Sequence, residues 1–198
     1  PSMRPWGEFL HSKGYTVRVP LLPGHGTKPE DLNKVKWQEW PAKVQAELDE
    51  LFKSCDQVFV AGLSMGGGTT LNIAQSNNDR LAGLILVNPM IHVAFLPHQL
   101  AYLISHFQKL RSSVGNDIKR PGITEHGYDA LPTRGIAELL KMLKITRKNL
   151  VFKFSEMNGL IEAQKALIRR TVKFSPFECF QEKRIKEKCL LTPHMKGI

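Results

Sequence analysis

The sequence has few of the features that mark metal, membrane or nucleic-acid proteins. Its three cysteines fit no metal-ligand spacing, and their odd number favours a reduced, cytoplasmic setting. No apolar run is long enough to cross a membrane, and no signal peptide is visible. The net charge of +10 comes from dispersed basic residues rather than a Lys/Arg run. It therefore favours a solvated basic surface over nucleic-acid binding.

What remains is the composition of an ordinary soluble protein. Hydrophobic residues make up 42% and charged residues 23% of the 198 positions, which suits one globular domain with a real core, covering 1–198. The chain does not begin with methionine, so we expect its natural N-terminus to lie upstream. The oligomeric state stays open.

One short pattern points to chemistry. Gly62-Leu63-Ser64-Met65-Gly66 has the form G-x-S-x-G; three β-favouring residues, 58–60, precede it and a helical pattern follows. This context predicts a strand, a sharp turn and a helix with Ser64 at the apex, a nucleophile elbow. The flanking glycines let the turn close, and the Met65 N–H is a candidate oxyanion donor. The alternative, a chance match in an ordinary turn, is less favoured because strand and helix are both expected.

Helical and strand patterns alternate along the first half of the chain. We expect helices over 3–13, 37–54 and 65–75, and strands over 15–22, 58–60 and 81–87. Such alternation predicts an α/β fold: a mostly parallel sheet with helices on both faces and active groups at the carboxyl ends of the strands.

A histidine in the loop 23–27 offers a competing interpretation. His25 lies between two glycines and could be read as a catalytic base. Its loop leaves a different strand and would have to reach Ser64. We therefore expect His25 to fix its own loop by hydrogen bonding.

The alternation breaks over 90–134, which is long for a connection inside a compact domain. Insertions of this size are often lids or binding loops, and an apolar cap over the serine would suit an acyl chain. The segment could equally pack a helix onto the core through Tyr102, Leu103 and Phe107, and the two readings are compatible. A helix is expected again over 135–148.

Several motifs in order resemble one family. Gly14-Tyr15-Thr16-Val17, then 23–27, then Trp37-Gln38-Glu39-Trp40, then 62–67, with Tyr128-Asp129 and Leu131-Pro132-Thr133, are similar to the bacterial carboxylesterase and monoacylglycerol lipase group of the α/β-hydrolase superfamily. The likeness covers about residues 2–150. It implies a serine hydrolase acting on acylglycerols or short to medium acyl esters, with Ser64 as nucleophile and with no metal or organic cofactor.

The C-terminal quarter departs from that group. The resemblance places a strand at 150–154 followed by the catalytic acid, where Glu156 or Asn158 lies, and then a base, for which His194 is the only histidine after 126. The group's second oxyanion donor would lie just before Pro1. Residues 151–198 hold 10 Lys/Arg and 5 Asp/Glu and read as helix or disordered tail rather than closing strands.

These departures lead to two expectations. The chain is a hydrolase truncated at its N-terminus, with a C-terminal quarter that is replaced or frame-shifted. Its function is either ester hydrolysis, with Glu156 as candidate acid and His194 as candidate base, or binding of a small apolar ligand without catalysis.

Overall fold

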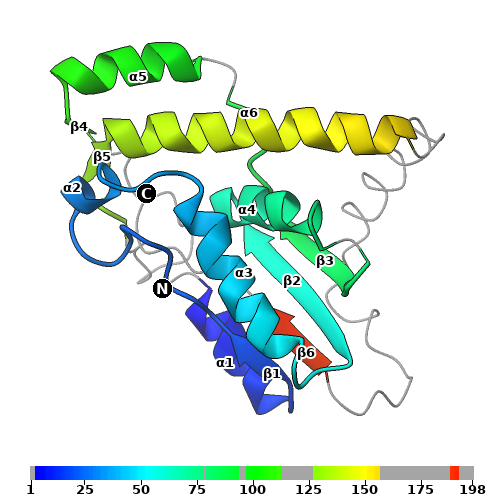
Figure 1. Cartoon of the computed structure of the whole chain (residues 1–198). Helices are drawn as coiled ribbons and strands as arrows, with labels where there is room; N and C mark the ends of the chain where they lie inside the picture. Colours follow the sequence, from blue (N-terminus) through cyan, green and yellow to red (C-terminus); the bar gives the residue numbers. More distant parts are fainter. Residues whose placement is uncertain (1–2, 78, 94–96, 113–126, 157–187, 192–198) are drawn as a thin grey trace.

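The computed structural model describes residues 3–77, 79–93, 97–112, 127–156 and 188–191, with 151–156 and 188–191 as backbone only. The helices are α1 (Arg4–Ser12), α2 (Pro29–Leu32), α3 (Glu39–Leu51), α4 (Met65–Ala74), α5 (His98–Phe107) and α6 (Thr133–Glu156). The strands are β1 (Thr16–Arg18), β2 (Gln57–Leu63), β3 (Leu81–Val87), β4 (Leu110–Ser112), β5 (Ala130–Pro132) and β6 (Lys188–Leu191). Figure 1 shows their arrangement.

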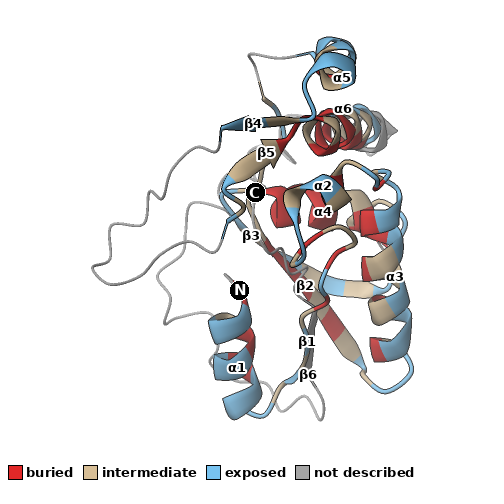
Figure 2. Cartoon of the chain, turned by 90° about the vertical axis from the view of Figure 1, so that its left-hand side faces the viewer, coloured by how far each residue is buried: buried red, intermediate tan, exposed pale blue. Residues whose placement is uncertain are grey.

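The main sheet is parallel and has helices on both faces, as the alternating pattern predicts. Its strand order is β1-β6-β2-β3, and every neighbouring pair in it runs parallel. Figure 2 shows α1 on one side of this sheet and α3 and α4 on the other. The predicted α/β fold class is therefore confirmed.

Strand β2 is the centre of the core because its side chains alternate between the two faces. Val58 and Val60 are fully buried in the cluster that includes Trp40 and Leu48 of α3. On the opposite face, Ala61 packs in the cluster formed with α1 and β1. Burial on both sides holds the end of β2, and so the turn that follows it, in a fixed place.

The first strand is shorter than the sequence predicts. A strand is expected over 15–22, but β1 spans only Thr16–Arg18. Pro20 has no N–H to donate, which explains why the ladder stops just before it.

The segment 90–134 holds one described helix, α5, and two described strands, β4 and β5. Helix α5 packs on α6, and β4 pairs with β5 in a two-stranded antiparallel ribbon. Both views place α5 and α6 beyond the carboxyl ends of β2 and β3. Packing of α5 on α6 through Tyr102 is thus confirmed, but the predicted packing of Leu103 and Phe107 is wrong, since they are 58% and 86% exposed. A role of the segment as a cap stays a prediction.

Helix α6 extends further than expected, and the predicted strand at 150–154 is wrong. The helix begins at Thr133 and ends at Glu156. The run Leu150-Val151-Phe152 favours strands by propensity, but propensity is a weak guide and a continuing helix overrides it here.

The C-terminal segment also corrects a prediction. Residues 188–191 form β6, which pairs with β1 on one side and β2 on the other, although the sequence favoured helix or tail there. The apolar run Cys189-Leu190-Leu191 is too short to stand out in a basic segment. Its position is set by partners far away in the chain.

Two further expectations concern the setting of the protein. Cys55 is disulfide-bonded, so the fully reduced cysteines expected from the odd count are not what the structure shows. Within the described residues, no helix combines the length and the apolar character needed to span a membrane.

Candidate active site at Ser64

Ser64 lies at the turn between β2 and α4, with backbone angles that side-chain-bearing residues rarely adopt. Its φ is 53° and its ψ is −118°. Three hydrogen bonds hold it: the Ser64 N–H donates to Val87 O at 3.0 Å, and its carbonyl accepts from Met90 N–H at 2.8 Å and Gly68 N–H at 3.2 Å. The end of β3 and the start of α4 together fix this strained residue.

The glycines around Ser64 are required by close backbone approach. A Cβ on Gly62 would lie 2.3 Å from the Gly66 carbonyl oxygen, and one on Gly67 would lie 2.7 Å from Pro89 Cβ. Neither position can hold a larger residue without moving the backbone. The requirement for glycine at 62, predicted from the turn, has this physical cause.

The start of α4 provides a polar environment for the serine. Ser64 is half-buried, and Met65 is the first residue of the helix, so its N–H has no acceptor within α4. The helix N-terminus carries a partial positive charge that favours a developing negative charge nearby. Among the described residues, no histidine or carboxylate hydrogen-bonds Ser64 Oγ.

His25 is a loop residue in the structure, as predicted. It is 2% exposed, and its Nδ1 lies 3.1 Å from the Pro23 carbonyl oxygen. That same carbonyl accepts a hydrogen bond from Trp40 Nε1, and the two rings pack edge to face. Burial lowers the pKa of His25. His25 thus ties its loop to α3.

The predicted acid and base remain untested by the structure. Glu156 is the last residue of α6, and only its backbone is described. Asn158 and His194 lie outside the described residues. Their roles therefore stay predictions.

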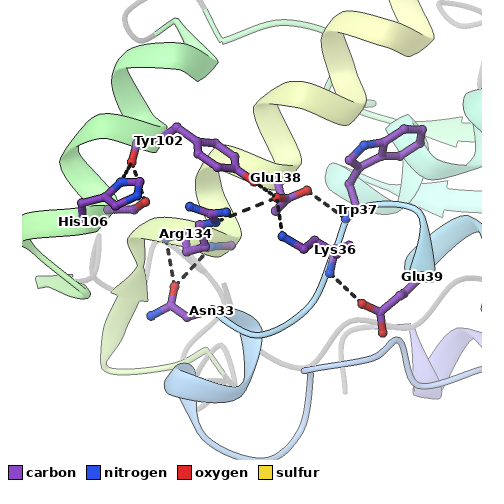
Figure 3. A network of polar contacts seen from close by, with 10 residues as sticks. Asn33, Lys36, Trp37, Glu39, Tyr102, His106, Arg134 and Glu138 are labelled. Atoms are coloured by element: carbon purple, nitrogen blue, oxygen red, sulfur yellow. Dashed lines mark hydrogen bonds and ion pairs between the residues drawn. The ribbon is translucent and has the colours of Figure 1, made fainter.

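A buried carboxylate that sequence reasoning missed connects three elements near this end of the sheet. Glu138 of α6 is 1% exposed and accepts hydrogen bonds from the Trp37 N–H at 3.1 Å and from the hydroxyl of Tyr102 in α5. Arg134 Nε and Lys36 Nζ lie 3.9 and 4.0 Å from its Oε1. Figure 3 shows these side chains converging on Glu138.

Tyr102 completes this contact between α5 and α6. The Arg134 guanidinium lies 3.6 Å from the centre of its ring, a cation–π contact. The pKa of Tyr102 is raised, mainly by partial burial and to a smaller extent by the hydrogen bond to Glu138. A glutamate in a helical pattern normally faces water, so no pattern in the sequence indicates one at the centre of a buried network.

Comparisons with known proteins agree with the fold. The family described as serine aminopeptidase, S33, matches residues 3–164. A thermostable monoacylglycerol lipase from Bacillus sp. (strain H-257) is 32% identical over 149 residues, which cover 75% of this chain and 59% of that enzyme. A solved structure from work on LipS and LipT, two metagenome-derived lipolytic enzymes, superposes with a TM-score of 0.70 at 30% identity, covering 76% of this chain and 61% of its own.

The chain spans about three-fifths of the length of the relatives it matches. The family match nevertheless covers most of the chain and includes β2, the Ser64 turn and α4. The chain therefore belongs to the serine aminopeptidase S33 family and has the α/β-hydrolase fold.

Proposed function

We propose that this chain carries the nucleophile of an enzyme that hydrolyses carboxylic esters, with acylglycerols or short to medium acyl esters as substrates. The observation that carries the proposal is Ser64, held at φ 53° between a parallel strand and a helix N-terminus. The names of the relatives, a monoacylglycerol lipase and lipolytic enzymes, support the same substrate class.

In this proposal the reaction passes through an acyl-enzyme. Ser64 Oγ attacks the ester carbonyl carbon while its proton passes to a base, and the Met65 N–H donates a hydrogen bond to the resulting oxyanion. The tetrahedral intermediate collapses as the base returns the proton to the leaving alcohol. Water then attacks the acyl group by the same route and releases a carboxylic acid.

Within this chain, His194 is the proposed base and Glu156 the proposed acid, as the sequence predicts. Without a base, a neutral serine hydroxyl is a poor nucleophile, and turnover would fall by several orders of magnitude. We also propose that 90–134, which includes α5, acts as a cap over the acyl chain.

A fluorophosphonate probe tests the nucleophile directly, because it forms a covalent bond with an activated serine. The probe should label the wild-type chain and leave Ser64→Ala unlabelled. Ser76→Ala is a matched control, since Ser76 is exposed and lies just after the same helix. Labelling that persists in Ser64→Ala would remove Ser64 from the proposal.

Turnover separates a catalytic chain from a binding module. Hydrolysis of a monoacylglycerol and of p-nitrophenyl butyrate should be lost in Ser64→Ala and strongly reduced in His194→Ala and Glu156→Gln. A folded wild-type chain that binds these esters and neither takes the label nor turns them over would support ligand binding without catalysis instead. Unchanged rates in His194→Ala would show that the base lies elsewhere.

A further inference from the structure

A cavity separate from Ser64 lies between the segment after β3, the start of α5 and the middle of α6. Its volume is about 240 Å³. Neither Ser64 nor Met65 lines it. It is smaller than the roughly 300–1,000 Å³ typical of sites that enclose a drug-sized ligand. It therefore suits a headgroup with a short piece of chain.

The inner wall of this cavity is apolar. Leu140 and Leu143 come from α6 and are 8% and 3% exposed, and Val93 packs against both of their clusters. These side chains belong to the core, so the wall is a fixed surface. Covering it with methylene groups would remove apolar area from water, which favours binding of an alkyl chain.

Among the described residues, the charged side chains of the remaining lining are all basic. The basic side chains of Lys144 and Arg147 from α6 line the cavity together with His92 and His98. In the described part of the chain, no carboxylate forms an ion pair with either Lys144 or Arg147. The nearest acid on α6, Glu138, is already engaged with Arg134, Lys36 and Tyr102.

The lowered pKa of His98 agrees with a positive electrostatic potential at the cavity. Partial burial lowers the pKa of His98, and the charges of Lys144 and Lys141 lower it further. No side chain caps the start of α5 at Pro97, so the first amides of that helix add to the same sign of potential at the cavity. An anion entering here would be attracted by every one of these groups.

We propose that this cavity binds the head and first methylenes of a single-chain anionic amphiphile, such as a fatty acid or an alkyl phosphate. The anionic head lies between Lys144 and Arg147, and the chain begins along Val93, Leu140 and Leu143. The site is independent of Ser64, so it does not require that the chain be catalytic.

Binding of decanoate, measured by calorimetry below its micelle concentration, tests the proposal on the full chain. Decanoate should bind more tightly than decanol, which lacks the charge, and than acetate, which lacks the chain. Decyltrimethylammonium should bind least. Decyl phosphate in the same assay distinguishes the two head groups. Lys144 and Arg147 together form what we call the basic rim of the cavity. If decanol bound as tightly as decanoate, the basic rim would have no role in binding, and the proposal would be overturned.

Variants of the rim locate the site. Lys144→Gln combined with Arg147→Gln should weaken decanoate binding by about tenfold, whereas Lys148→Gln, an exposed residue of the same helix outside the cavity, should leave it unchanged. All three positions are surface lysines or arginines, and circular dichroism checks that the variants fold. Equal affinity in the double variant and the wild type would refute the site.

A spectroscopic readout separates this site from the serine. Decanoate should raise the pKa of His98, followed by its imidazole signals in NMR, in both the wild type and Ser64→Ala. Loss of decanoate binding in Ser64→Ala, with the rim variant unaffected, would place the ligand at the serine instead. Failure of the hydrolase proposal changes neither expectation.

Discussion

Glu138 offers the sharpest test of how α5 is held on the body of the protein. Replacing it with alanine removes the acceptor for the buried Trp37 N–H and the Tyr102 hydroxyl. It also leaves Arg134 and Lys36 without their shared carboxylate. Each of the two orphaned donors costs about 1–3 kcal/mol. Arg134 and Lys36, whose side chains are 26% and 59% exposed, can turn toward water. We therefore expect Glu138→Ala to lower the free energy of unfolding by about 2–6 kcal/mol.

The variant Glu138→Gln, which keeps the shape of the side chain, shows how much of the lost stability comes from the charge of Glu138. In Glu138→Gln, the amide oxygen can still accept from the Trp37 N–H, and the amide nitrogen can donate to the Tyr102 oxygen. What is lost is charge, and with it the strength of charge-assisted hydrogen bonds. The expected cost is about 1–2 kcal/mol. Glu8→Gln is the control, because Glu8 pairs with Arg4 at a site where its side chain is 62% exposed, and it should change stability by less than about 0.5 kcal/mol.

Urea unfolding, followed by tryptophan fluorescence and circular dichroism, measures these differences. Hydrogen exchange adds a local readout: the amides of α5 should exchange faster in Glu138→Ala relative to those of α4, because Tyr102 has lost its partner on α6. A Glu138→Ala variant as stable as Glu8→Gln would refute the reasoning. So would equal losses from the alanine and glutamine variants, since the donors would then not depend on a retained acceptor.

Three further predictions concern the Ser64 turn and the loop of His25. Ser64→Gly should raise the free energy of unfolding by about 1 kcal/mol, measured in urea, because glycine adopts φ 53° without strain; a loss of stability would contradict this. Gly62→Ala should lower the free energy of unfolding by about 3 kcal/mol, since the new Cβ would lie 2.3 Å from the Gly66 oxygen. Gly14→Ala is the comparison: Gly14 has a φ of 86° but nothing within 4 Å of an added Cβ, so its loss reports backbone angles without a clash. Because burial lowers the pKa of His25, the unfolded chain takes up its proton first. Stability from the neutral ring is thus present above about pH 6.5 and lost as pH falls below it. His25→Asn should flatten this fall in unfolding curves recorded from pH 7 to pH 5, and an unchanged slope would count against it.

The parts of the fold that the sequence predicts well are those where pattern and packing agree. Helix α3 places Trp40, Val44, Leu48 and Leu51 on one buried face, and β2 is buried on both of its faces. The glycines at 62 and 66 revealed the turn through the G-x-S-x-G pattern, and at 62 the close approach of the Gly66 carbonyl leaves no room for a side chain. In these places the local chain carries the information that the tertiary structure uses.

The misses have the opposite cause. Val151 and Phe152 favour a strand locally, yet they continue α6. Glu138 looks like a solvent-facing helix residue until Trp37 and Tyr102, 101 and 36 positions away, are placed beside it. The basic cavity likewise draws its lining from three segments, so no single window of sequence could reveal it.

Strand β6 shows how far the position of the candidate nucleophile depends on a remote segment. In the described sheet, β1 does not pair with β2 directly; both pair with β6, over 16–18 on one side and 57–60 on the other. Strand β2, which ends at the Ser64 turn, therefore has β3 as one neighbour and a strand from the C-terminal quarter as the other. Removing β6 would leave β1 and one edge of β2 with unpaired backbone groups. The segment that least resembles the family is thus the one that makes its sheet continuous.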